Sequence, residues 1–341
     1  MIFNRALDLG RNCPTNLTEV DFKRGPYLDQ NTSSTTMQPS GTSGSVTITA
    51  SSSTFVANDV GRLIKIKSGH AKITNYSSGT QVTATTTDDF ANTNAETEWS
   101  LGAWCTDKGY PRTVSFFEQR LVFGGSTAYP QTIWASESGL YEEFDAGDGS
   151  AADAFIYTIA ANRVNVIRWL APARDLIVGT VGGEFKVGRP TGEPLKPDNV
   201  QITQQTTYGG YTTQPIQIGN AVLFVQRQQK KVREFAYRFE SDAYLAPDMT
   251  LLAEHITDTG IIDVDYAQEP DSIYWAVRTD GTLIGMTYQR DEDVIACHRQ
   301  EFGGSIKYVF NGKGKRLRPI LLMLTGNALE VDKNELQNAA I

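Results

Sequence analysis

The side chains that could perform chemistry are scattered through the sequence and do not form an enzyme motif. The three histidines, His70, His255 and His298, are isolated, and none has a metal-binding spacing to another. The sequence contains neither a Gly-x-Ser-x-Gly nucleophile motif nor a phosphate-binding Gly-x-x-x-x-Gly-Lys-Ser/Thr motif. Adjacent acids such as Asp88-Asp89 are typical of solvated turns. We therefore expect no catalytic residue, no cofactor and no metal site, and interpret the protein as non-enzymatic.

The cysteines argue against a disulfide framework. Cys13, Cys105 and Cys297 are odd in number and widely spaced, and no Cys-x-x-Cys pair occurs. Reduced, partly buried thiols are the expected state, as in a protein that folds in a bacterial cytoplasm.

Two short segments have residue types suited to binding a partner. Residues 226–233 hold the basic cluster of the β-rich region, at the position expected for a hairpin turn. It could contact DNA or an acidic surface of a neighbouring chain, or be an exposed polar turn. The aromatic Tyr-Gly-Gly-Tyr segment at 208–211 could be an interface loop or a packed loop. The candidate channel or subunit contacts are Arg227, Lys230, Lys231, Arg233, Tyr208 and Tyr211.

Composition and charge describe a globular, acidic chain. Hydrophobic residues make up 40% of the 341 residues, so a sizeable core can be buried. The net charge of −8 argues against a basic nucleic-acid surface. An acidic body could let DNA slide past, although the charge could equally serve solubility alone. No apolar run is long enough to span a membrane, and no apolar signal core follows Met1.

The elements that must position these residues are predicted to be β-strands. Residues 41–104 alternate apolar and polar positions, with Thr and Ser abundant, and are interpreted as a small inserted β domain. From residue 110 onward, groups of three strands recur, and their middle strands begin at Leu121, Leu176, Val222 and Ile273. A period near 50 residues is typical of propeller blades. An ordinary antiparallel meander is the alternative.

The predicted fold class is therefore all-β, with propeller-like blades of antiparallel strands, a small inserted β domain and a short C-terminal helical segment. Residues 1–40 are assigned to a strand and loop segment of the propeller, 41–104 to the insert and 105–304 to the blades. The dipeptide Asp280-Gly281 predicts a hairpin with a type I′ turn.

Several long strings resemble one family. Residues 114–125 read Val-Ser-Phe-Phe-Glu-Gln-Arg-Leu-Val-Phe-Gly-Gly, and 246–256 read Ala-Pro-Asp-Met-Thr-Leu-Leu-Ala-Glu-His-Ile. Further matching segments lie at 60–66, 130–136, 141–144, 222–226, 231–235, 268–272 and 275–283. Over about residues 19–304 the chain resembles the tail nozzle family of short-tailed phages, also called tail tubular protein B or the DNA-stabilisation protein.

The resemblance implies a structural virion protein that is assembled in the bacterial host cytoplasm. It implies a sixfold homo-oligomeric ring that contacts the portal, the adaptor and other tail proteins and encloses the path of the phage DNA. It implies no membrane association and no catalytic residues. A host-surface glycan-binding module of a phage tail is the alternative function.

The last 37 residues have a different character. Residues 305–341 hold six Lys or Arg against three Asp or Glu and show helical spacing. The segment Gly-Lys-Arg-Leu-Arg-Pro around Lys315, Arg316 and Arg318 resembles the pyrophosphate-binding segment of trans-prenyl diphosphate synthases. The aspartate-rich motif that binds the metal in that family does not follow, so prenyl transfer is not expected. A chimeric junction near residue 304 explains this change, and a native C-terminal helix is the alternative.

Overall fold

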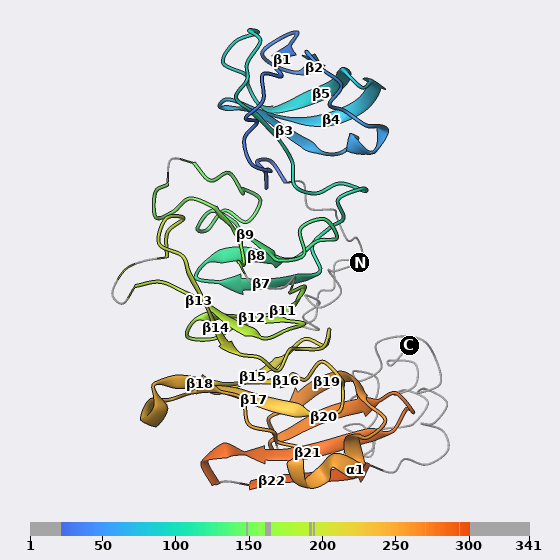
Figure 1. The fold of residues 1–341 in the computed structure, drawn as a ribbon, viewed down its shortest axis with the longest axis vertical. Helices are drawn as coiled ribbons and strands as arrows, with labels where there is room; N and C mark the ends of the chain where they lie inside the picture. The colour runs from blue at the N-terminus through green and yellow to red at the C-terminus, as the bar shows by residue number, and fades with distance from the viewer. Residues whose placement is uncertain are drawn as a thin grey trace. The chain divides into compact units, whose positions relative to one another are not determined.

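The computed structural model describes residues 22–147, 149–160, 165–190, 193, 195–269, 271–292 and 294–300. Strands dominate, and the fold class predicted from the sequence is confirmed as all-β and propeller-like (Figure 1). The expected C-terminal helical segment at 305–341 lies outside the described residues. The chain divides into two compact units. The N-terminal unit comprises residues up to 167 together with 186–203, and the C-terminal unit comprises 168–185 and those from 204 onward.

The inserted domain is one six-stranded antiparallel sheet, drawn in blue and cyan in Figure 1. Its order is β1-β2-β5-β4-β3-β6, and its strands are β1 (Met37–Pro39), β2 (Ser45–Ala50), β3 (Leu63–Ile66), β4 (Gly69–Ser78), β5 (Gln81–Asp88) and β6 (Trp99–Leu101). Alternating residues such as Ile48, Ile64 and Ile73 are buried in its core, as the period-two pattern predicts. The sheet begins at Met37, ahead of the predicted start of the insert at residue 41.

Four further sheets follow, each with four antiparallel strands in sequential order. The first contains β7 (Thr113–Phe117), β8 (Arg120–Gly124), β9 (Thr132–Ala135) and β10 (Phe155–Thr158). The second contains β11 (Ile167–Pro172), β12 (Leu176–Thr180), β13 (Glu184–Gly188) and β14 (Gln201–Thr206). The third contains β15 (Ile216–Ile218), β16 (Ala221–Val225), β17 (Val232–Arg238) and β18 (Ala243–Leu245). The fourth contains β19 (Ile261–Ala267), β20 (Ile273–Arg278), β21 (Leu283–Gln289) and β22 (Val294–Gln300).

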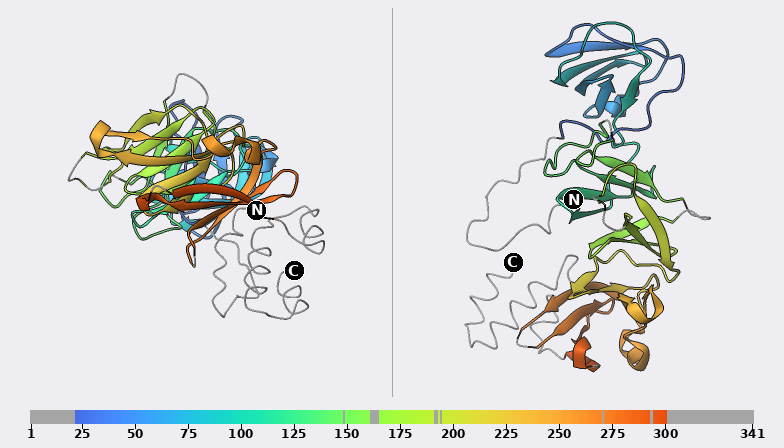
Figure 2. Two further views of the ribbon diagram at one scale, coloured as in Figure 1. Left: turned by 90° about the horizontal axis from the view of Figure 1, so that it is seen from below. Right: turned by 90° about the vertical axis from the view of Figure 1, so that its left-hand side faces the viewer.

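The four sheets share the plan of a propeller blade. Every residue of β8, β12 and β16 is buried, which requires that both faces of each strand be covered. These strands begin within one residue of the repeat positions predicted from Leu121, Leu176 and Val222. Figure 2 shows the same sheets from two further directions. In the C-terminal unit the short helix α1 (Glu254–Thr257) contacts β22.

The hairpin at Asp280-Gly281 is present, but the predicted turn type is wrong. Of the two turn residues, Gly281 alone has a positive φ, of 81°. The Gly281 N–H donates to Arg278 O at 3.0 Å, and the Arg278 N–H donates to Thr282 O at 2.9 Å. This is a three-residue loop with glycine in the left-handed position, whereas a type I′ turn needs a positive φ at both central residues.

The described cysteines, Cys105 and Cys297, are free thiols, and Cys13 lies outside the described residues. Within the described part of the chain, no helix has the length and apolarity needed to cross a bilayer.

Candidate interaction site

The aromatic loop at 206–211 connects β14 to β15 and is anchored from beneath by a buried carboxyl group. Glu184, the first residue of β13, has no exposed surface. Its Oε2 accepts a hydrogen bond from Thr206 Oγ1, whereas Oε1 has no hydrogen-bond partner among the described residues. The backbone N–H groups of Tyr208 and Gly209 act on the carboxyl group by lowering its pKa. The carboxyl group therefore holds the start of the loop at Thr206.

Glu184 lacks an ion-pair partner among the described residues. Burial raises the pKa of its carboxyl group to about 7, and the three donors from the loop lower the pKa only in part. The group therefore changes its charge near neutral pH. Sequence reasoning missed Glu184, although an acid inside the apolar strand Gly183–Val187 was the signal that could have identified it.

The two glycines of the loop are required by close backbone approach. Gly209 has φ +76°, and a Cβ there would lie 2.1 Å from Val181 O. A Cβ on Gly210 would lie 2.2 Å from Nε1 of the buried Trp169. The Gly210 N–H donates to Thr180 O at 2.8 Å. The loop thus lies tightly on the edge of its own sheet, because glycine avoids clashes that any side chain would cause.

Tyr208 and Arg233, two of the predicted contact residues, lie together. The Arg233 guanidinium is 3.5 Å from the centroid of the Tyr208 ring, which is 39% exposed. Arg233 Nε donates to Gln226 Oε1 at 2.8 Å, and Arg233 Nη1 donates to Ala246 O. A cation stacked in this way fixes the ring while leaving its other surface accessible.

The remaining predicted contact residues do not form one cationic face. Lys231 is paired with Asp248 and Glu254, at 2.8 and 3.0 Å. Tyr211 is partly buried and packs against the core of the C-terminal unit. Arg227 and Lys230 remain as exposed cations on the predicted turn between β16 and β17.

The arrangement of these residues suits contact with a partner. Around Tyr208 the structure presents an aromatic ring, a stacked guanidinium and a flanking exposed arginine. A role in contacting DNA or another subunit stays a prediction. The second predicted set, Lys315, Arg316 and Arg318, lies outside the described residues.

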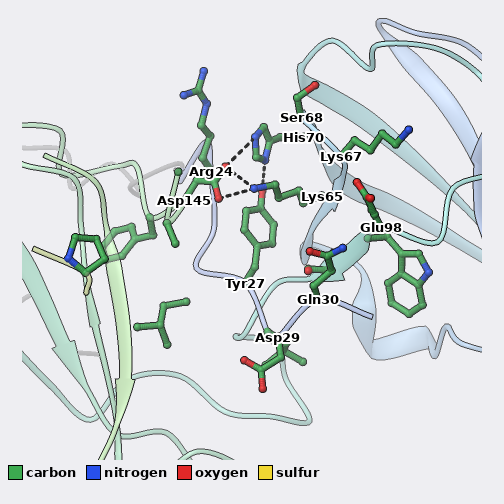
Figure 3. A pocket seen from close by; sticks show the side chains of 18 of the residues that line it. Arg24, Tyr27, Asp29, Gln30, Lys65, Lys67, Ser68, His70, Glu98 and Asp145 are labelled. Atoms are coloured by element: carbon green, nitrogen blue, oxygen red, sulfur yellow. Dashed lines mark hydrogen bonds and ion pairs between the residues drawn. The ribbon is translucent and has the colours of Figure 1, made fainter. Parts of the chain in front are cut away.

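A groove in the N-terminal unit brings together residues that the sequence did not connect. His70 is buried, and its Nδ1 lies 2.6 Å from the hydroxyl of Tyr27. Its Nε2 lies 3.5 Å from Asp145 Oδ2, and Lys65 Nζ donates to both oxygens of Asp145, at 2.7 and 2.8 Å. Figure 3 shows this network of four side chains in the groove. His70 is isolated in the sequence but not in the fold.

Burial fixes the proton positions in this network. Burial lowers the pKa of His70 to about 4 and raises the pKa of Tyr27 far above its ordinary value. Because Asp145 can only accept, we assign the His70 proton to Nε2, so that Nδ1 accepts from the Tyr27 hydroxyl. In the described part of the chain, no three metal-ligating side chains come together.

Comparison with known proteins finds weak structural similarities. No protein-family model matches the chain, and no curated protein matches it. An auxiliary nutrient binding protein from Bacteroides thetaiotaomicron is 9% identical, with a TM-score of 0.33, over 77% of this chain and 70% of that one. A candidate 6-phosphogluconolactonase from Bacteroides uniformis is 9% identical, with a TM-score of 0.43, over 78% and 71%. A protein from Lactobacillus plantarum is 12% identical, with a TM-score of 0.37, over 80% and 82%. Likenesses this low assign no function to the chain.

Proposed function

We propose that this chain is a structural component of a phage tail, in which it packs against other copies and other tail proteins around the path of the DNA. The observation that carries the proposal is the exposure of large apolar side chains on the C-terminal unit. Leu252 is 95% exposed and Phe239 is 85% exposed. Leu251, next to Leu252, is 63% exposed, so two consecutive leucines present an apolar surface of the kind that a protein partner covers.

The position of these side chains in the sequence adds support. Leu251 and Leu252 begin the short helical turn η4 (Leu251–Ala253) and lie inside the nozzle-like string 246–256. Phe239 begins a second turn, η3 (Phe239–Ser241), directly after β17. Ala253 of η4 is buried in the core of the C-terminal unit, whereas Leu252 and Phe239 are left exposed. A protein that functions by assembly needs such surfaces, whereas a monomeric enzyme does not.

Assembly of the full chain is the test. We expect size-exclusion chromatography with light scattering to give a species of about six times the chain mass, the ring size that the family resemblance implies. Leu252→Asp combined with Phe239→Asp should shift this species to monomer, because a charge in an apolar interface is costly to desolvate.

The matched control is Val60→Asp, which places the same charge at a 48% exposed apolar side chain of the inserted domain. That variant should assemble like the unmodified chain. If the unmodified chain is a folded monomer at every accessible concentration, or if Val60→Asp dissociates it equally, the proposal fails.

A further inference from the structure

The groove around Tyr27 has the size and opening of a ligand site. It is an open cavity of about 910 Å³ in the N-terminal unit. Four segments line it: residues 24–30, residues 65–70 at the β3–β4 hairpin, residues 98–100 at β6 and the loop 144–147. Phe155, Ile156 and Pro197 complete the lining. Ligand sites in proteins span roughly 300–1,000 Å³. The groove is therefore large enough for a ligand of several sugar rings.

The charges that line the groove cancel. Three cations and three anions face it, with His70 neutral, so their sum is zero. They are Arg24, Lys65, Lys67, Asp29, Glu98 and Asp145. An anionic ligand would meet three carboxylates, and a cationic ligand would meet three cations. The lining thus carries no excess charge of its own and offers both donors and acceptors of hydrogen bonds to a ligand.

The cations of the groove are already held by protein carboxylates. Lys65 pairs with Asp145 at 2.7 Å, and Lys67 pairs with Glu96 at 2.8 Å. Arg24 pairs with Asp88 at 2.6 Å. A phosphate or a carboxylate ligand would have to displace one of these partners. Hydroxyl groups of a ligand would not have to displace a partner. They can accept hydrogen bonds from the N–H groups that remain and donate hydrogen bonds to carboxylate oxygens.

Two carboxylates of the groove remain open to a ligand. Asp29 and Glu98 are exposed, and neither side chain has a hydrogen-bond or ion-pair partner among the described residues. Gln30 beside them adds an amide that both donates and accepts. Figure 3 shows these three side chains apart from the network of Tyr27, His70, Asp145 and Lys65. Carboxylates that can accept hydrogen bonds from a ligand thus lie beside a network of side chains that hold one another in place.

The groove also offers apolar surface to the C–H groups of a sugar ring. Trp99 lines it and is partly buried, and the Trp99 indole N–H donates to Thr35 O at 2.9 Å, which fixes the ring. Ile156 lines it and is 38% exposed. Rings that are apolar on one face and polar at one edge are suited to such mixed contacts.

We propose that this groove binds a neutral oligosaccharide. Its hydroxyl groups donate to Asp29 and Glu98 and exchange hydrogen bonds with Gln30, while the apolar face of one sugar ring packs near Trp99. The chemistry that carries the proposal is the balanced charge, the two unpaired carboxylates and the fixed aromatic ring. The proposal does not depend on the assembly of the chain.

The test uses the full chain and a panel of neutral hexasaccharides built from glucose, mannose, galactose or N-acetylglucosamine. Saturation-transfer NMR and calorimetry should detect millimolar or tighter binding of at least one of them. Asp29→Ala combined with Glu98→Ala should weaken that binding at least tenfold. Both positions are exposed, so the fold should persist, and circular dichroism checks this.

Glu240→Ala, which removes an exposed carboxylate from the C-terminal unit, is the control and should bind like the unmodified chain. The proposal is overturned if no neutral hexasaccharide binds, or if the double variant binds as well as the control. It is also overturned if the groove binds only an oligolysine peptide or only a sulfated oligosaccharide, since either result would mean recognition by charge.

Discussion

Each of the two units buries a titratable group, but the surroundings of the two groups differ. In the C-terminal unit, the Glu184 carboxyl group is held by the Thr206 hydroxyl, without an ion-pair partner among the described residues. In the N-terminal unit, His70 lies between Tyr27 and an Asp145–Lys65 ion pair. Both groups are driven toward their neutral form by burial. A carboxylate becomes neutral by gaining a proton, whereas an imidazolium becomes neutral by losing one. The stability of the two units should therefore change with pH in opposite directions.

The difference shows how the surroundings of a buried group affect what it can do. Glu184 serves a single loop, and its charge changes near neutral pH because nothing nearby neutralises it fully. His70 is one member of a network whose charges balance, and its pKa of about 4 keeps it neutral at ordinary pH. The first arrangement makes a loop sensitive to pH. The second makes a fixed wall, which is what a binding groove needs.

The largest expected effect is that of Glu184→Gln. Because the folded pKa of about 7 exceeds the ordinary 4.5, the stability from Glu184 is complete below pH 4.5 and is lost as pH rises through 7. A shift of this size corresponds to about 3 kcal/mol. The C-terminal unit of the variant should therefore be more stable than that of the unmodified chain at pH 8, and the difference should vanish near pH 5.

Urea denaturation with hydrogen exchange of the 201–211 segment, at pH 5, 6, 7 and 8, measures this difference within the relevant unit. Glu193→Gln, an exposed position in the N-terminal unit, is the matched control and should have no such effect on that segment. Parallel pH profiles for the Glu184→Gln variant and the unmodified chain would contradict the interpretation of Glu184.

The next effect has the opposite sign and concerns His70→Gln. The folded pKa of about 4 lies below the ordinary 6.5, so the stability from His70 is present above pH 6.5 and is lost as pH falls through 4. After discounting for its charged neighbours, we expect about 2 kcal/mol of acid sensitivity from this group. Glutamine keeps an acceptor for Tyr27 and a donor for Asp145, so the variant should fold and lose less stability on acidification.

Hydrogen exchange of the 63–76 segment between pH 7 and pH 4 measures the effect on the inserted sheet. His255→Gln, at an exposed position of the C-terminal unit, is the matched control and should leave this segment unchanged. If the His70→Gln variant and the unmodified chain lose protection equally on acidification, His70 is not the group that responds.

The comparison also shows what could be predicted from the sequence. The first three strands of every blade were predicted, because their apolar residues alternate or form buried runs. The fourth strands, β10, β14, β18 and β22, were not. β14 reads Gln-Ile-Thr-Gln-Gln-Thr and has no fully buried residue, so its place is fixed by pairing and not by a hydrophobic pattern.

The buried polar groups around Glu184 and His70 were not predicted, for a different reason. Tyr27 and His70 are 43 residues apart in the sequence, and only the fold brings them into contact. By contrast, the Tyr-Gly-Gly-Tyr loop was identified because its residue types are unusual in themselves. Local composition thus revealed the surface loop, whereas the buried groups that support the loop and the groove depend on long-range pairing.

A smaller effect is expected from Lys65→Met, which tests whether the network in the N-terminal unit is held by its ion pair. The side chains of Lys65 and Asp145 are 27% and 18% exposed, so solvent screens the pair only in part. Leaving Asp145 without its ammonium partner should cost about 1 kcal/mol. Adding Asp145→Asn should recover most of the loss, and urea denaturation of the four chains of this cycle measures the coupling. Additive losses would mean that the pair does not stabilise the network.

The smallest expected effect is that of Arg233→Lys, which tests whether the guanidinium stacked on Tyr208 helps to hold the aromatic loop. Lysine keeps the charge but loses the planar group stacked on Tyr208, so we expect a loss of about 0.5–1 kcal/mol. Hydrogen exchange in residues 206–211 should increase several-fold, while Arg227→Lys at the exposed neighbouring position should change nothing. If both variants match the unmodified chain, the stacking of Arg233 on Tyr208 does not stabilise the loop, which then depends on Glu184 and on backbone hydrogen bonds such as that from Gly210 to Thr180.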